Sequence, residues 1–364
     1  MRALSDSGQA DVVLVAPAAA GRLSGGFLVN EELLETGVVA AAVAHGPAEL
    51  ERTLSRIGAR HTILADSIYL FDEPSAVALA RAALGQRIVL LAHSLPSLIP
   101  HRPIDERRRF LAREREVLAA AHGAVAPGSF LASALVRRGL ARDRVSVVPP
   151  APIVDGRRAK REDRAPSGPL EILTVANWSG AKGFFDAARA LCLLPHIDWR
   201  WSIVGSRDGA GELARRVDSL IAEHGLSDRV TIAGPVEPDA LAGRYARADI
   251  FLLPSLMESY GLAFAEALTY GVPVVGYRCA EVPSVVGAAG RLCRAGSHAA
   301  LAESIEALAS DRRVLLDALR RTARDVSHAL PDRSGFRRAF ADAVDRLGRL
   351  HPTFLRSGPR EASR

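Results

Sequence analysis

Short apolar runs alternate with amphipathic stretches along most of the chain, and this alternation limits the possible folds more than any other feature. The runs predict strands and the stretches between them predict helices. The strands are therefore expected to pair in parallel and to lie buried beneath helices on both faces. The strand candidates of the first half are Asp11–Pro17, Val38–Ala44, His61–Ala65, Ile88–Ala92, Gly123–Ala126 and Val145–Val148.

A proline-rich segment interrupts the alternation near the middle of the chain. Residues 149–169 hold five prolines, a run of charges and no apolar periodicity, which is typical of a linker between domains. The alternation then resumes, so we predict an α/β protein in which two Rossmann-like parallel-sheet domains face a cleft. The strand candidates of the second half are Glu171–Val175, Trp201–Val204, Val230–Ala233, Ile250–Leu253 and Val272–Gly276.

The length of 364 residues suits two domains of ordinary size. Near the end of the chain, Ser334–Arg349 has the amphipathic pattern of a helix. The expected parts are a first domain at 1–150, a linker at 151–169, a second domain at 170–330 and a C-terminal helix within 331–364.

The composition excludes several classes of protein. No apolar run has the length of a membrane span, and Met1–Gly8 lacks the charged and apolar regions of a secretion signal. The cysteines Cys192, Cys279 and Cys293 follow no zinc or disulfide spacing. A reduced cytoplasm is therefore the expected location.

The charge pattern gives little sign of a charged macromolecular partner. The net charge is +6, and the arginine clusters at 107–109, 137–138 and 157–161 have acidic neighbours. Solvated helix faces and a linker are the favoured interpretation, and attraction to anionic lipid headgroups or to an anionic substrate is the alternative. No nucleic-acid partner is expected, because no basic stripe is interleaved with aromatic residues.

Two glutamates at a strand-to-helix junction give the strongest signal for a binding site. The apolar run Phe251–Leu253 predicts a strand, and Tyr260–Tyr270 predicts a helix that Gly271 ends. Glu258 then lies at the carboxyl end of a strand, where open α/β sheets bind ligands, and Glu266 lies about two turns further on. Such carboxylates suit two hydroxyl-bearing parts of one ligand, although two solvated glutamates are the commoner arrangement at this spacing.

A second junction carries one of the two lysines of the chain. Lys182 follows the strand candidate Glu171–Val175, in a glycine-containing loop that precedes a predicted helix. An ammonium beside a helix N-terminus suits a diphosphate, and an exposed lysine in a turn is the plain alternative.

Three further residues follow predicted strands. Gly25 and Gly26 come after the first strand, in an expected loop whose backbone can approach a ligand closely. His93 ends the strand Ile88–Ala92. Glu281 follows the strand after the two-glutamate helix, and an acid in a surface loop is its default interpretation.

The segment from Pro254 to Val275 resembles the Glu-x7-Glu signature of family-4 glycosyltransferases, which are retaining enzymes of the GT-B fold with nucleotide-sugar donors. Its pattern, P-S-x-x-E-S-x-G-L-x-x-x-E-A-x-x-x-G-x-P-V, fills nearly every fixed position of that signature. Lys182 and the glycine after it match the family element that clamps the donor diphosphate. Asn177 stands where that element has an arginine, and Arg207 is our candidate to replace the missing charge.

The resemblance implies a role for each residue. Glu258 would hold a hydroxyl of the donor sugar, Glu266 the ribose, and Lys182 the departing diphosphate, while His93 would contact the sugar from across the cleft. The implied catalytic residues are Glu258, His93 and Lys182. The implied donor-binding residues are Gly25, Gly26, Asn177, Lys182, Gly205, Arg207, Ser259, Tyr260, Gly261, Leu262 and Glu266.

The same resemblance implies that the first domain binds the acceptor, the second binds the donor, and the C-terminal helix returns to the first domain. The expected enzyme is bacterial and moves a hexose from a UDP- or GDP-sugar to a hydroxyl of a small molecule, lipid-linked glycan or polysaccharide precursor. It would work in the cytoplasm or at the inner membrane face. No metal is expected, because no Asp-x-Asp triplet occurs. A GT-B epimerase or hydrolase and a non-catalytic sugar-nucleotide-binding protein remain alternatives.

Overall fold

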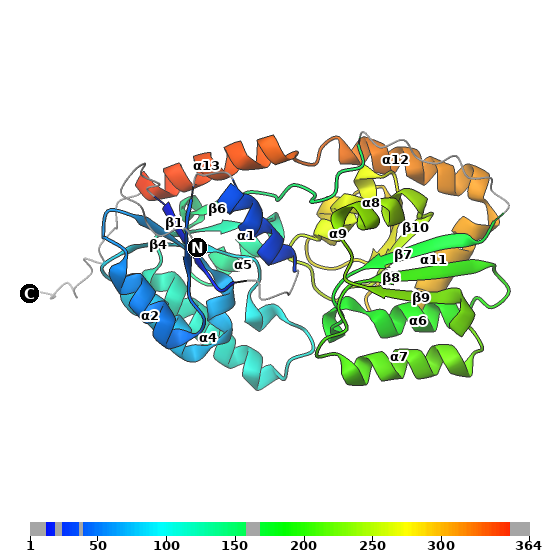
Figure 1. The fold of residues 1–364 in the computed structure, drawn as a ribbon, viewed down its shortest axis with the longest axis horizontal. Coiled ribbons are helices and arrows are strands. Elements are labelled where there is room, and N and C mark those ends of the chain that lie inside the picture. The colour runs from blue at the N-terminus through cyan, green and yellow to red at the C-terminus, as the bar shows by residue number, and fades with distance from the viewer. Residues whose placement is uncertain (1–11, 19–23, 36–38, 158–167, 350–364) are drawn as a thin grey trace, which may run out of the picture.

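Two six-stranded parallel sheets, each covered by helices on both faces, form two domains in the computed structural model (Figure 1). The structure describes residues 12–18, 24–35, 39–157 and 168–349. The predicted α/β architecture with two parallel sheets is confirmed.

The first sheet has the strand order β2-β1-β3-β4-β5-β6, so the chain reverses its direction of winding between β1 and β3. Its central strands are continuous buried runs, as a sheet with both faces covered requires. The strands are β1 (Val12–Ala16), β2 (Ala40–Val43), β3 (Thr62–Asp66), β4 (Arg87–Leu91), β5 (Gly123–Ala126) and β6 (Val145–Val147).

Different helices cover the two faces of this sheet. One face buries residues of α2 (Pro47–Arg56), α3 (Glu73–Ala82), α4 (Ile104–Ala120) and α5 (Ser129–Arg137). The other face buries residues of only α1 (Gly25–Glu35) and α13 (Arg333–Arg349) among the described helices. The last of the described helices therefore completes the core of the first domain (Figure 1).

The second sheet has the strand order β12-β11-β10-β7-β8-β9, and its winding reverses between β7 and β10. Its strands are β7 (Leu170–Val175), β8 (Trp199–Val204), β9 (Val230–Gly234), β10 (Ile250–Leu253), β11 (Val274–Tyr277) and β12 (Gly290–Cys293). One face buries residues of α6 (Phe184–Cys192), α7 (Gly211–Glu223) and α11 (His298–Ser310). The other buries residues of α8 (Pro238–Arg247), α9 (Leu262–Thr269), α10 (Val282–Val286) and α12 (Asp317–Ser327).

The structure corrects three local predictions. Strand β12 was not predicted, because its four residues are only half-buried and give no apolar run. Helix α9 begins at Leu262 rather than at Tyr260, because Gly261 before it has a φ of 102° that a helix does not contain. Gly25 and Gly26 form the first turn of α1 rather than a loop.

Some predictions fall outside the described residues. These are the N-terminal Met1–Gly8 segment, most of the charged run of the linker at 158–167, and the end of the chain from 350 to 364.

Candidate functional site

The carboxyl ends of β7 and β10 lie side by side at the point where the second sheet reverses its winding. Ligands of open α/β sheets bind at such points. Two contacts fix the loops there against each other. The amide of Leu256 donates to the carbonyl of Ala181 at 2.7 Å. Gly183 has a φ of 68°, and a Cβ atom there would lie 2.0 Å from the carbonyl oxygen of Pro254.

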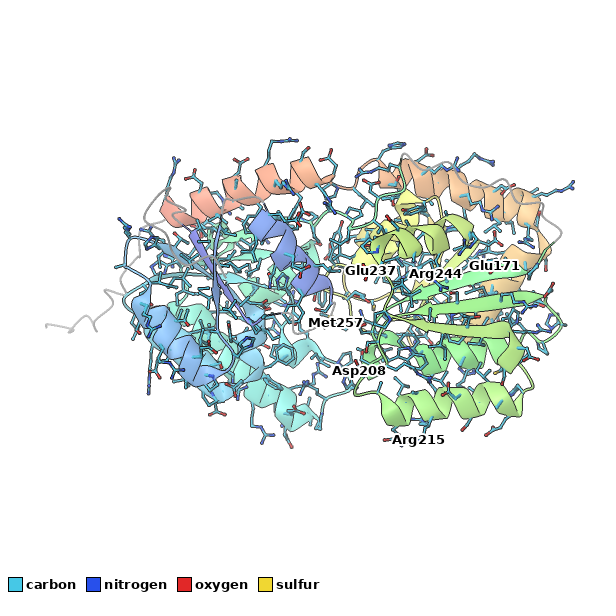
Figure 2. The ribbon with its side chains drawn as sticks, in the orientation of Figure 1. Glu171, Asp208, Arg215, Glu237, Arg244 and Met257 are labelled. Carbon is cyan, nitrogen blue, oxygen red and sulfur yellow. The ribbon has the colours of Figure 1, made fainter. Side chains whose placement is uncertain are left out.

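The joined loops bring Lys182 and Glu258 into direct contact. Nζ of Lys182 lies 2.7 Å from Oε1 of Glu258, and the Ser255 hydroxyl donates to the same oxygen at 2.7 Å. Glu258 is 8% exposed, so its carboxylate is held in place beneath the surface of the loop. Figure 2 labels the adjacent Met257 on the side of the second domain that faces the first.

Asn177 has a structural partner in the neighbouring loop. Its Oδ1 accepts a hydrogen bond from the amide of Ser206 at 2.9 Å, which joins the loop after β7 to the loop after β8. Gly205 lies in the latter loop with a φ of 135°, and a side chain there would overlap the carbonyl of Ala176. Asn177 therefore orders these loops and brings no charge to them.

Arg207 is engaged elsewhere and does not support the expected replacement of the missing arginine. One of its terminal nitrogens lies 2.7 Å from both carboxylate oxygens of Asp218 on α7. Its guanidinium lies 4.5 Å from the ring centroid of Trp178, which stacks on Phe184. The contact with Asp218 occupies only one terminal nitrogen of the guanidinium, so the predicted contact of Arg207 with a diphosphate stays a prediction.

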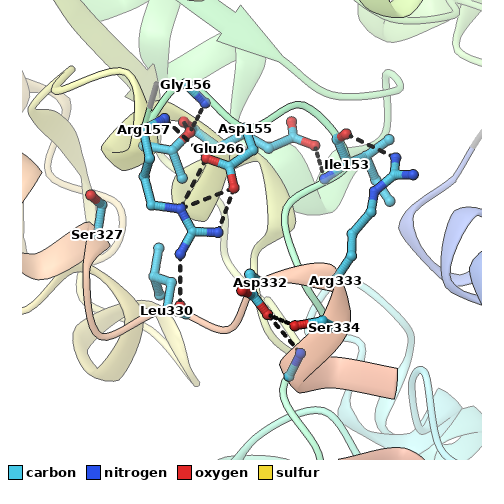
Figure 3. A network of polar contacts seen from close by, with 12 residues as sticks. Ile153, Asp155, Gly156, Arg157, Glu266, Ser327, Leu330, Asp332, Arg333 and Ser334 are labelled. Carbon is cyan, nitrogen blue, oxygen red and sulfur yellow. Dashed lines mark hydrogen bonds and ion pairs between the residues drawn. The ribbon is translucent and has the colours of Figure 1, made fainter. Parts of the chain in front are cut away.

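Glu266 lies on α9 beneath the crossing from the first domain to the second (Figure 3). Its carboxylate is 5% exposed and accepts hydrogen bonds from the Tyr245 hydroxyl at 2.9 Å and from the amide of Ile153 at 3.2 Å. Burial raises its pKa to about 7, against the opposing effect of these hydrogen bonds. The predicted contact of Glu266 with a ribose stays a prediction.

The same region ties together the two chain segments that connect the domains. Arg157 is paired with Asp155 in the first crossing, and its other terminal nitrogen donates to the carbonyl of Leu330 in the second at 3.1 Å (Figure 3). Asp332 then accepts hydrogen bonds from the Ser334 hydroxyl and the Gly335 amide at the start of α13. Glu266 is thus linked through Ile153 to the segments that connect the domains.

The raised pKa of Glu266 predicts a pH-dependent stability that Glu266→Gln removes. Because the folded state holds this proton up to about pH 7 and the unfolded chain releases it near pH 4.5, the contribution to stability is complete below pH 4.5 and is lost by about pH 7. The free energy of unfolding of Glu266→Gln relative to the unchanged protein should rise by about 3 kcal/mol between pH 4.5 and 7.5.

Urea denaturation followed by tryptophan fluorescence measures this effect, because Trp178, Trp199 and Trp201 all lie in the second domain. Glu303→Gln, on an exposed face of α11, is the matched control and should keep a constant difference at all pH values. A constant difference for Glu266→Gln as well would contradict the assigned pKa.

The first domain presents a hydrogen-bonded polar triad where its own winding reverses. Nδ2 of Asn30 donates to Asp66 at 2.7 Å, which turns Oδ1 of Asn30 toward Nε2 of His93 at 2.8 Å. Burial lowers the pKa of His93, with Asp66 opposing, so the ring is neutral near pH 7. Nε2 then donates to Asn30 and Nδ1 is the acceptor nitrogen of the ring.

The start of α1 lies between this triad and the second domain. A Cβ atom added at Gly26 would lie 3.1 Å from the ring of His93, and one added at Gly25 would lie 3.3 Å from Leu262. The small residues therefore let the first turn of α1 reach both sides of the interface.

Of the four predicted donor contacts at 259–262, Tyr260 is buried and the other three are half-buried.

Asn30 and Asp66 were not singled out from the sequence. Asp66 had a usable signal, because it directly follows the predicted strand His61–Ala65 and so had to lie at a strand end. Asn30 had none, since it lies in the middle of a helix and is positioned only by the tertiary fold.

Two further features of the described residues bear on the site. No group of three or more histidine, cysteine, aspartate or glutamate residues in the described ranges is placed to hold a metal ion. Among those residues, no helix combines the length and the apolar composition that crossing a membrane requires.

Residues 156–326, which include the whole second sheet, match the family model described as "Glycosyl transferases group 1". The match links the second domain to the group 1 glycosyltransferases. The predicted resemblance to this family is thereby confirmed for the part of the chain that carries Lys182, Glu258 and Glu266.

Curated relatives of this chain carry related names. The chain is 35% identical over 236 residues to a D-inositol 3-phosphate glycosyltransferase of Nocardia farcinica, which covers 59% of this chain and 50% of that protein. It is 31% identical over 209 residues to a putative colanic acid biosynthesis glycosyltransferase, WcaL, of Escherichia coli. This alignment covers 54% of this chain and 50% of that protein. The chain thus spans about half the length of the curated relatives it matches.

Solved structures extend the likeness over both domains. HepE of Anabaena, in complex with UDP and glucose, aligns with a TM-score of 0.74 over 92% of this chain and 99% of its own, at 16% identity. Sucrose-phosphate synthase of Thermosynechococcus elongatus aligns with a TM-score of 0.73 over 92% of this chain and 98% of its own, at 19% identity. This likeness confirms the GT-B fold of the chain.

Proposed function

We propose that this chain is a retaining glycosyltransferase that moves a hexose from a nucleoside-diphosphate sugar to a hydroxyl group of an acceptor. The contact between Lys182 and Glu258 at the switch point of the second sheet carries the proposal. It sets a cation for the diphosphate and a carboxylate for the sugar side by side. The family of the second domain, and a structural neighbour that binds UDP and glucose, support a nucleotide sugar as the donor.

Lys182 serves the leaving group in this proposal. Negative charge grows on the diphosphate as the glycosidic bond breaks, and a preorganised ammonium stabilises that charge most strongly in the transition state. Glu258, aligned by Ser255 and Lys182, accepts a hydrogen bond from a sugar hydroxyl and orients the ring. The backbone around Ser259–Leu262 completes the donor pocket, and Glu266 lies nearest the nucleoside.

His93 acts from the opposite domain. Its neutral ring, held by Asn30 and Asp66, offers Nδ1 as an acceptor for a hydroxyl of the sugar or of the acceptor. Retention follows when the acceptor approaches the face that the diphosphate leaves and the departing phosphate takes the acceptor proton. No protein nucleophile enters this scheme.

A thermal-shift screen with UDP-, GDP- and ADP-sugars tests the proposal. A donor at 100 times its dissociation constant should stabilise the second domain by about 2.7 kcal/mol. Product analysis with the stabilising donor should then show release of the nucleoside diphosphate, with the α or β configuration of the transferred sugar unchanged. Stabilisation without turnover of any kind would favour a binding protein, and an inverted product would exclude retention.

Turnover is expected to persist in EDTA. The reason is that Lys182 supplies the charge that a metal ion supplies in enzymes with a metal-bound diphosphate. The rate with EDTA should stay within about twofold of the rate with added Mg²⁺ or Mn²⁺. Loss of turnover on chelation that a metal ion restores would contradict this prediction.

A further inference from the structure

Glu281 lies in the second domain but makes its side-chain contacts with the first. It is 5% exposed, which overturns its interpretation as a surface acid. Its carboxylate accepts a hydrogen bond from the amide of Phe130 at 2.6 Å and another from the Ser129 hydroxyl at 3.1 Å. Both donors belong to the first turn of α5, so a carboxylate of one domain caps a helix of the other.

The N-terminus of helix α5 has no side-chain cap of its own and leaves space for this carboxylate. Its first turn contains no acidic residue, and its cap residue, Gly128, has no side chain to accept a hydrogen bond. A carboxylate at a helix N-terminus satisfies free amides and meets the positive end of the helix dipole. A Cβ atom at Gly128 would lie 2.5 Å from Cδ of Glu281, so the glycine leaves the space that the carboxylate fills.

The loop that carries Glu281 is strained and is joined to the candidate donor site. Ala280 has a φ of 45°, and it is the only non-glycine residue with a positive φ in the described part of the chain. The amide of Glu281 also approaches the carbonyl oxygen of Glu258 at 3.4 Å. The same short segment therefore touches Glu258 on one side and the first domain on the other.

We infer that Glu281 is an interdomain positioning residue that holds the first domain closed over Glu258 by capping α5. The reaction that it assists rests on the proposed function, whereas the closure itself does not. The contact with α5 must break when the domains separate, because its donors and its acceptor lie on opposite domains. Charge-assisted hydrogen bonds of this kind shift an open–closed equilibrium by about tenfold or more.

Gly128→Ala tests the inference without removing any polar group. The φ of Gly128 is −162°, which alanine adopts freely, and the three atoms nearest to the added methyl group all belong to the Glu281 side chain. Gly128→Ala and Glu281→Ala should each raise the radius of gyration in X-ray scattering and lower kcat/KM about tenfold. Gly85→Ala, where an added Cβ atom meets nothing within 4 Å, and Glu303→Ala on an exposed face of α11 are the matched controls.

The double variant, Glu281→Ala with Gly128→Ala, tests whether both changes act through the same contact. Once Glu281 is alanine, adding Gly128→Ala should change neither the scattering nor kcat/KM. Full, independent effects in the double variant, or unchanged scattering in both single variants, would overturn the inference. A change in scattering together with no turnover of any nucleotide sugar would leave the closure in place and refute the proposed function. Circular dichroism confirms that every variant is folded.

Discussion

Lys182→Ala is expected to lower turnover about 100- to 1,000-fold, the usual effect of removing one preorganised group that stabilises transition-state charge. The change deletes the ammonium that lies 2.7 Å from Glu258 and leaves that carboxylate with the Ser255 hydroxyl. The loss should fall mainly on kcat, because charge develops on the diphosphate as the bond breaks. Lys182→Arg keeps the charge and should recover part of the rate.

Arg189→Ala is the control for this experiment, since Arg189 is an exposed cation on the adjoining helix α6. Steady-state kinetics with the donor found by thermal shift gives kcat and KM for each variant. Equal losses in Lys182→Ala and Arg189→Ala would show a general effect of positive charge. A change in KM alone would mean that Lys182 binds the ground state and transition state equally.

Phe340→Ala is expected to destabilise the first domain by about 3–5 kcal/mol, the usual cost of emptying a buried phenylalanine site. Phe340 is 2% exposed on α13 and packs with Phe336, α1 and the sheet of the first domain. Phe340 lies almost two hundred residues after β6, the last strand of that sheet in the sequence. The sequence alone therefore does not predict that removing its ring destabilises the first domain.

The placement of tryptophan lets one sample report both domains. All three tryptophans lie in the second domain, so fluorescence follows its unfolding, while circular dichroism follows both domains. Phe340→Ala should lower the midpoint of the dichroism transition and leave the fluorescence transition near its original position. Asp342→Ala, an exposed change on the same helix, should alter neither. Equal shifts of both signals in Phe340→Ala would show that the two domains unfold as one unit.

Local patterns predicted eleven of the twelve described strands and one half of the candidate site. The strand candidate Ile250–Leu253 is a buried apolar run and appears with its predicted bounds. The helix predicted at Ser334–Arg349 begins one residue earlier. Lys182 and Glu258 each carried a strand-end signal, and adjacent parallel strands place such ends together.

The other half depended on contacts that no local pattern contains. Glu281 resembles any loop acid until α5 of the first domain is placed against it. Arg207 looked available for a diphosphate, but Asp218 and Trp178 hold it. Gly25 and Gly26 suggested a loop, since glycine is rare in helices, yet crowding by His93 and Leu262 favours them at the start of α1.

Because α13 covers one face of the first domain, the order of synthesis and the order of folding differ. While the ribosome is still making the second domain, the buried partners of Phe336, Phe340 and Leu347 remain without their cover. All twelve of the described strands will have been synthesised before this helix emerges, so the domain made first is the one that must wait to finish folding. The nascent chain thus carries an apolar surface through most of translation, a surface that chaperones recognise.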